Sequence, residues 1–153
     1  MPFAISVDEA PEGGLWIGTW EGLSRFDGRE FESFGTESGL APALCFELAL
    51  DPEGRLWTTP YRAGLARFVP DADEGQTRFR TFAITADGAG DEVDALLFDE
   101  RGMWVGTTAG VHRAREREQP SFELVWPAPA RPWHLQASFR AEGRGWIVTA
   151  EQA

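Results

Sequence analysis

The sequence of 153 residues contains a single cysteine, Cys45, which lies in the apolar run ALCFELAL. The chain can therefore form no internal disulfide and no cysteine metal cluster. We expect Cys45 to be a small core residue rather than a nucleophile. Long apolar runs are also missing, since none approaches the roughly 18 residues that span a membrane. The first residues, MPFAISVDEA, carry neither the basic nor the apolar region of a signal peptide.

Positive charge is scarce, because 14 lysine and arginine residues stand against 25 aspartate and glutamate residues, for a formal net charge of −11. The isoelectric point is near 4.6. Such a surface repels phosphate backbones and anionic lipids, so we expect no binding to nucleic acid or to an anionic membrane surface. A hydrophobic content of 42% and a charged content of 25% are typical of a globular chain, and the length fits one domain.

Tyrosine occurs once, whereas the chain has seven tryptophans and eleven phenylalanines. Four of the tryptophans recur at intervals of 41, 47 and 42 residues, as Trp16, Trp57, Trp104 and Trp146. A glycine precedes each by two or three residues, and a threonine follows about three residues later. In the first three copies a second glycine and an apolar residue then lead to an arginine, namely Arg25, Arg67 and Arg113. This periodicity indicates a repeat architecture.

Each complete repeat also has the pattern of four strands. The apolar runs FAISVDE, CFELALD, VDALLFD and LQASFRA predict a first strand, and LWIGT with its relatives predicts a second one after a turn. GLSRF and GLARF predict a third strand after a glycine hairpin, and EFESF, RFRTF and SFELV predict a fourth. No stretch has the 3.6-residue period of a helix. The sequence therefore predicts an all-β fold with almost no helix.

Four antiparallel strands in roughly 40 residues are typical of one blade of a β-propeller. We predict a single propeller segment over residues 1–153, with repeats at about 3–34, 44–82 and 93–126 and a partial one at 133–150. The repeated tryptophans would fill the core between blades. About three and a half blades form an incomplete ring, because closed propellers have four to eight blades.

An open ring would expose aromatic blade faces and unpaired strand edges, which favour association. The simplest expectation is that the segment is part of a longer propeller with further blades. Self-association, or completion by a partner chain, is the alternative.

The stretches GGLWIGTWEGLSRFDG and RGMWVGTTAGVHR resemble the two-component regulator propeller repeat, in which G-x-L-W-[IV]-G-T leads to G-[LV]-x-R. The resemblance covers about residues 3–150, although the second copy departs from it at Thr58 and Pro60. In this family such propellers are commonly the extracytoplasmic sensing part of hybrid regulators. The resemblance therefore implies a non-catalytic sensing or binding module for signal transduction. The chain would be periplasmic as part of such a sensor, and otherwise cytoplasmic.

A second similarity relates DPEGRLWTTP to the propeller repeats of the streptogramin lyase group. The chemistry of that family requires a histidine base and a nearby metal-binding carboxylate. The histidines here are His112 and His134, and neither has an acidic partner at a recognisable spacing. We therefore expect no enzymatic activity, no cofactor and no metal. A lyase-type enzyme fragment and a protein-interaction scaffold are the alternative functions.

By analogy with the propeller fold, the turns between second and third strands and the connections between blades share one face, where ligands bind. The candidate residues at these positions are Trp20, Glu21, Tyr61, Arg62, Thr108, Trp133 and His134. Three aromatic rings with a few polar neighbours suit a carbohydrate or another flat or amphipathic small molecule. The alternative is that these rings only cover the tops of the blades.

Overall fold

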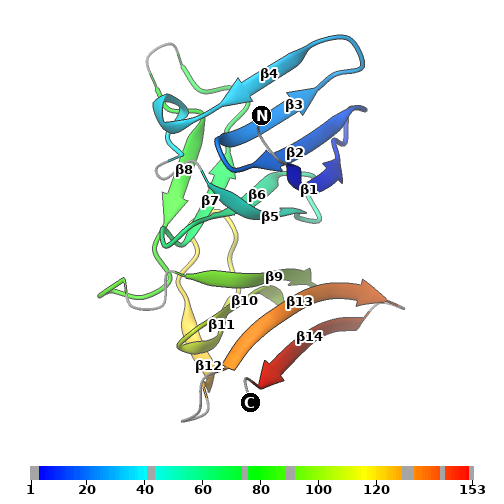
Figure 1. The fold of residues 1–153 in the computed structure, drawn as a ribbon. Coiled ribbons are helices and arrows are strands. Elements are labelled where there is room, and N and C mark those ends of the chain that lie inside the picture. The colour runs from blue at the N-terminus through cyan, green and yellow to red at the C-terminus, as the bar shows by residue number, and fades with distance from the viewer. Residues whose placement is uncertain are drawn as a thin grey trace. The chain divides into compact units, whose positions relative to one another are not determined.

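The computed structural model describes residues 4–40, 44–73, 76–88, 92–128, 133–141 and 144–151, where the regular structure is strand apart from one 3₁₀ helix, η1 (Thr36–Ser38) (Figure 1). The described residues include no helix with the length and apolarity that crossing a bilayer requires. The strands are β1 (Ala4–Glu9), β2 (Leu15–Thr19), β3 (Gly22–Phe26), β4 (Phe31–Phe34), β5 (Cys45–Leu50), β6 (Leu56–Pro60), β7 (Leu65–Phe68), β8 (Phe79–Phe82), β9 (Val93–Asp99), β10 (Gly102–Thr107), β11 (Gly110–Ala114), β12 (Glu123–Pro127), β13 (Trp133–Ala141) and β14 (Arg144–Glu151).

Consecutive strands pair in antiparallel fashion and form separate sheets. The first sheet has the order β1-β2-β3-β4, the second β5-β6-β7-β8 and the third β9-β10-β11-β12, while β13 and β14 pair with each other as the fourth sheet. The prediction of an all-β fold with almost no helix is confirmed, and the meandering four-stranded sheets are of the β-propeller type. Residues 1–82 and 83–153 form two compact units.

The strand register explains why an arginine recurs with each tryptophan. In all three four-stranded sheets the two residues are direct cross-strand partners, and such partners project to the same face of a sheet. Each guanidinium carbon lies 5.4–5.8 Å from the centre of its tryptophan ring, within cation–π range, in the pairs Trp16–Arg25, Trp57–Arg67 and Trp104–Arg113. The repeated arginine therefore covers the repeated tryptophan within one sheet.

The glycine that opens the third strand of a sheet is required by a close backbone contact. Gly22 and Gly110 have φ angles of 141° and 137°, which disfavour other residues. A Cβ on Gly22 would lie 2.1 Å from the carbonyl oxygen of Phe34, and one on Gly110 would lie 2.2 Å from that of Trp126. Phe34 and Trp126 therefore occupy the same place in the first and third sheets.

Threonine hydroxyls close the turns that precede these glycines. The Thr19 hydroxyl donates a hydrogen bond to the Gly22 carbonyl (2.9 Å) and accepts one from the Glu21 N–H (3.2 Å). Thr107 makes the same bond to Gly110 in the third sheet (3.2 Å). The repeated threonine is thus a turn residue, because it satisfies backbone groups that the tight hairpin leaves free.

In the first unit, the Trp16 face of the first sheet packs against the second sheet. The ring centre of Phe68 lies 4.9 Å from that of Trp16 and 5.3 Å from that of Phe34, and Phe79 lies 5.6 Å from Phe34. Cys45 is buried in the same cluster, as predicted. Trp16 is only 2% exposed, which confirms its assignment to the core between two sheets.

A buried carboxylate fixes the turn before β6. One Asp51 oxygen accepts hydrogen bonds from the Trp57 indole (2.9 Å) and the Arg55 side chain (2.8 Å). The other oxygen accepts the backbone N–H groups of Glu53 (3.1 Å) and Arg55 (2.9 Å). Both oxygens are therefore committed to the turn and to the orientation of the buried Trp57 ring.

In the second unit, β13 and β14 lie against β9 and β10. Ala95 and Val111 of the third sheet are buried, and Trp104 and Ala128 pack against them while staying partly exposed. The side chain of Trp146 lies outside the described residues. Trp16 and Trp57 are therefore buried, whereas Trp104 is only partly buried, and a place between two sheets is shown for Trp16.

Candidate ligand-binding site

The turns that carry the predicted aromatic residues emerge at one edge of the first unit. A Cβ on Gly18, near the end of β2, would lie 3.4 Å from the Cys45 carbonyl oxygen at the start of β5. Cys45 in turn pairs with Pro60, the last residue of β6. The turns with Trp20 and Tyr61, which follow β2 and β6, therefore leave the two sheets at the same edge. We call Trp20, Glu21, Phe46, Tyr61 and Arg62 the aromatic edge.

The backbone and its neighbours hold the Tyr61 ring. The Tyr61 N–H donates to the Leu44 carbonyl (2.8 Å), and its ring meets Phe46 edge-on with centres 5.8 Å apart. The Arg62 guanidinium lies 5.4 Å from the Tyr61 ring centre. Arg62 has a φ of 56°, a left-handed conformation that costs about 1 kcal/mol for a residue with a side chain. The turn thus keeps a cation beside an aromatic ring that is 36% exposed.

Phe46 is a member of the edge that the sequence did not identify, because its run CFELAL reads as an ordinary apolar strand. A register shift between Cys45 and Leu48 marks a bulge in β5. The hydroxyl of Thr59 accepts the Glu47 N–H (3.0 Å), and that of Thr58 donates to the Glu47 carbonyl (2.9 Å). The two threonines that distinguish the second copy therefore hold this bulge next to Phe46, whose side chain is exposed.

The other predicted residues are distributed differently. Trp20 is 61% exposed, and Glu21 is exposed beside it in the turn after β2. Thr108 is exposed in the equivalent turn between β10 and β11 of the second unit. Trp133 and His134 begin β13, and their side chains lie outside the described residues. The structure therefore brings Trp20, Glu21, Tyr61 and Arg62 to one edge, whereas the contribution of the other three stays a prediction.

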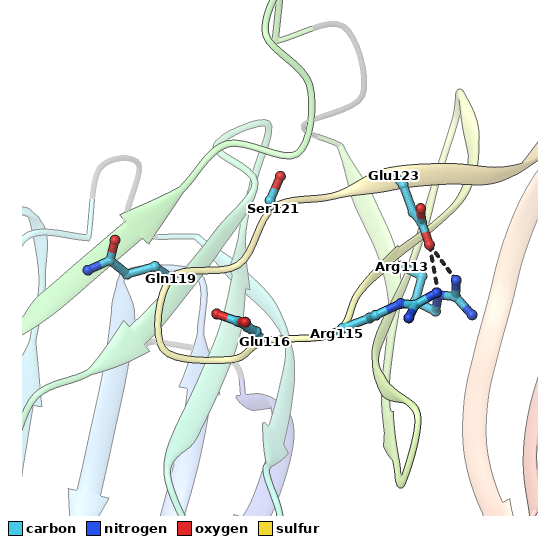
Figure 2. A pocket seen from close by; sticks show the side chains of 6 residues that line it. All are labelled: Arg113, Arg115, Glu116, Gln119, Ser121 and Glu123. Atoms are coloured by element: carbon cyan, nitrogen blue, oxygen red, sulfur yellow. Dashed lines mark hydrogen bonds and ion pairs between the residues drawn. The ribbon is translucent and has the colours of Figure 1, made fainter.

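Two cavities lie at the other end of β3 and of β11. β3 runs to its cavity from the turn with Trp20, and β11 runs to its cavity from the equivalent turn with Thr108. One, of about 400 Å³, lies beside the β11–β12 turn and is lined by Arg113, Arg115, Glu116, Gln119, Ser121 and Glu123 (Figure 2). The other, of about 460 Å³, is lined by Arg25, Asp27, Glu30, Phe31 and Glu32. Both are formed around the repeated arginine, at the same place in the first and third sheets.

Some of the charged groups around these cavities already have partners within the chain. Figure 2 shows the Arg113 and Glu123 side chains meeting, with Nε and Oε1 3.0 Å apart. This hydrogen bond and the charge of Arg113 lower the pKa of Glu123. The backbone N–H groups of Glu30 and Arg29, each 2.8 Å from an Asp27 oxygen, likewise lower the pKa of Asp27. These groups hold strands and turns in place, so their role is structural.

Two of the described residues suited to catalysis, Cys45 and His112, are buried. Burial raises the pKa of the Cys45 thiol to about 11, which keeps it protonated and weakly nucleophilic at neutral pH. His112 is buried in β11, where burial lowers its pKa, and its Nδ1 lies 3.5 Å from the Thr107 hydroxyl. In the part of the chain that the structure describes, no three His, Cys, Asp or Glu side chains are grouped to hold a metal ion.

No family model matches this chain, and no curated protein matches it. Two solved structures from B. thetaiotaomicron share its fold, each named as the extracellular domain of a hybrid two component system. The first, BT4673, has a TM-score of 0.75 at 16% identity over 94% of this chain and 19% of its own. The second, BT3049, has a TM-score of 0.74 at 19% identity over 95% of this chain and 20% of its own.

The chain therefore spans about a fifth of the length of the structures it matches. The fold likeness agrees with the resemblance of the LWIGT repeats to those of two-component regulators. The chain has the fold found in extracellular domains of signalling proteins.

Proposed function

We propose that the chain is a ligand-sensing segment of a larger β-propeller in the extracytoplasmic part of a signalling protein. In this proposal each four-stranded sheet is one blade and the fourth sheet is half a blade, so that about three and a half blades belong to a longer ring. The fold likeness to extracellular domains of two component systems, of which the chain spans about a fifth, supports this view. A periplasmic or extracellular location follows from it.

The observation that carries a binding role is the aromatic edge. Trp20, Phe46 and Tyr61 are all exposed there, although large apolar side chains are normally buried. Arg62 and Glu21 place charges of opposite sign beside these rings. A ligand that offers both apolar faces and hydroxyl groups fits this combination, so we propose a carbohydrate or a similar amphipathic molecule.

Substitutions at the aromatic edge test this proposal. Trp20→Ala and Tyr61→Ala should weaken binding of an oligosaccharide from a screened panel by about tenfold or more, because each removes one stacking surface. Both residues are exposed, so the melting temperature should stay within about 2 °C of that of the parent chain. Isothermal titration calorimetry and thermal melts measure the two effects.

Phe31→Ala is the matched control. Phe31 is 65% exposed on β4 beside the cavity at the opposite edge, and its ring stacks on Phe26 with centres 4.6 Å apart. Its removal should leave binding unchanged. Equal affinity in all three variants would contradict the proposed site, and a large loss of stability in the Trp20 and Tyr61 variants would assign those residues to the framework.

A further inference from the structure

The third sheet carries an exposed tryptophan at a position that is buried in the first sheet. Trp126 on β12 pairs with Val111, and Phe34 on β4 pairs with Leu23. The carbonyl oxygen of Trp126 lies close to Gly110, and that of Phe34 lies close to Gly22 in the same way. The two residues are therefore at equivalent positions. Phe34 is nevertheless 3% exposed, whereas Trp126 is 67% exposed. The two residues differ in what covers them.

In the first sheet, the cover comes from the third and fourth strands of the neighbouring sheet. The Phe34 ring meets Phe68 on β7 and Phe79 on β8, both edge-on. The Arg78 guanidinium, one residue before β8, lies 5.7 Å from the Phe34 ring centre. A hairpin of two strands with an aromatic pair on one face therefore buries Phe34.

Trp126 shares a face of the third sheet with two buried residues, Ala95 and Val111. Ala95, Gly106, Val111 and Trp126 are successive cross-strand partners, so they share one face of the third sheet. In the same unit β13 lies beside β9 and β10, and β14 lies beside β9. Among the described residues β14 pairs with β13 alone, so its other edge offers free backbone groups. The uncovered tryptophan and the open edge are what a missing third and fourth strand would leave.

We propose that the β14 edge and Trp126 together form a docking site for a β-hairpin of the same repeat, supplied by polypeptide outside the described residues. The first strand of this hairpin adds to β14 as β7 adds to β6, and its aromatic pair covers Trp126 as Phe68 and Phe79 cover Phe34. A second copy of this chain is a poorer source. Its own third and fourth strands are already hydrogen-bonded within complete sheets. This inference rests on the proposed propeller.

A synthetic peptide of residues 64–82, which spans β7 and β8, serves as the hairpin probe. It is added to the full 153-residue chain labelled with 5-fluorotryptophan, and the Trp126 resonance is assigned with Trp126→Phe. We expect a saturable shift of the Trp126 ¹⁹F signal. Amides of residues 144–151 should also exchange with deuterium about tenfold more slowly, because ladder hydrogen bonds protect them.

A peptide with Phe68→Ser and Phe79→Ser is the matched control, and it should bind about tenfold or more weakly. The same loss is expected when Trp126→Ser is combined with the parent peptide. If neither the Trp126 signal nor the amides of 144–151 respond, the docking site is overturned. A Trp126 signal that depends on chain concentration without peptide overturns it as well, because a second copy is then the occupant.

This test is separate from that of the ligand site. Trp20 lies in the first unit, away from β12 and β14 in the chain, so Trp20→Ala should leave peptide binding unchanged. A variant that loses oligosaccharide binding but keeps peptide binding is affected at the aromatic edge only. A variant that loses peptide binding but keeps oligosaccharide binding is affected at the docking site only.

Discussion

The first and third sheets have the same strand order and the same pairing of tryptophan with arginine, yet their outer strands differ in exposure. In the first sheet Trp16 and Phe34 are buried under the aromatic residues of the second sheet. In the third sheet Trp104 is partly exposed and Trp126 is mostly exposed, beside a sheet of two described strands.

The difference shows that the repeat determines the register, while the neighbouring sheet determines burial. The cross-strand pairs and the turn glycine are internal to a sheet, so they are the same in both copies. Burial of the outer strand depends on third and fourth strands that belong to the next repeat. The same motif can therefore form a core in one place and an exposed apolar surface in another.

The largest effect should come from shortening the two equivalent outer-strand residues. Phe34→Ala should destabilise the chain by about 3–5 kcal/mol, because it opens a cavity against Phe68 and Phe79. Trp126→Ala should change the free energy of unfolding by no more than about 0.5 kcal/mol, because its side chain already meets solvent. Urea denaturation of both variants measures the contrast, and equal losses would mean that Trp126 is covered in solution.

A smaller loss is expected at the turn of the second sheet. Asp51→Ala should cost about 3 kcal/mol, because it leaves the buried Trp57 indole without its acceptor and frees several turn donors. Ala10 holds the corresponding turn of the first sheet without a carboxylate, through its N–H to the Gly14 carbonyl (3.2 Å). Ala10→Ser is the comparison and should cost only about 1 kcal/mol, because it adds a hydroxyl at a buried position but removes no acceptor. A neutral Asp51 variant would show that the backbone bonds of the turn suffice.

The strands, the buried Trp16 and the glycine turns could be predicted because they depend on local pattern and on residues that recur at a fixed period. The role of the repeated arginine could not, since it requires the register that places Arg25 opposite Trp16. Phe46 was missed for a related reason, because it is exposed next to a bulge in β5 and the alternation of CFELAL gives no sign of that bulge.

The exposure of Trp126 could not be predicted from the sequence pattern either. The run SFELVW predicts an outer strand like EFESF, and the structure places that strand at Glu123–Pro127, slightly later than predicted. Whether its aromatic residue is buried depends on another segment of polypeptide. The candidate edge residues Trp20 and Tyr61 were identified because they vary between copies, in turns whose framework stays constant.

A third pair of variants should lower the free energy of unfolding equally, because it changes a turn glycine that the first and third sheets share. Gly22→Ala and Gly110→Ala should each cost about 2 kcal/mol, because the backbone there has a positive φ and a methyl group would meet a carbonyl oxygen. Thermal or urea unfolding measures both. Unequal losses would mean that the outer strand of the third sheet moves aside more readily than that of the first.

The smallest expected effect is a pH dependence of stability that comes from the third sheet. His112 occupies the strand position held by Ser24 in the first sheet and by Ala66 in the second. Burial lowers its pKa below the ordinary value of 6.5, so the unfolded chain takes up a proton more readily than the folded chain. The stability contributed by neutral His112 is therefore complete above pH 6.5 and is lost as the pH falls through the lower folded pKa. Urea unfolding at pH 8, 6.5 and 5 should give a flatter profile for His112→Ala than for the parent chain, and parallel profiles would show that the imidazole gains a proton without cost inside the sheet.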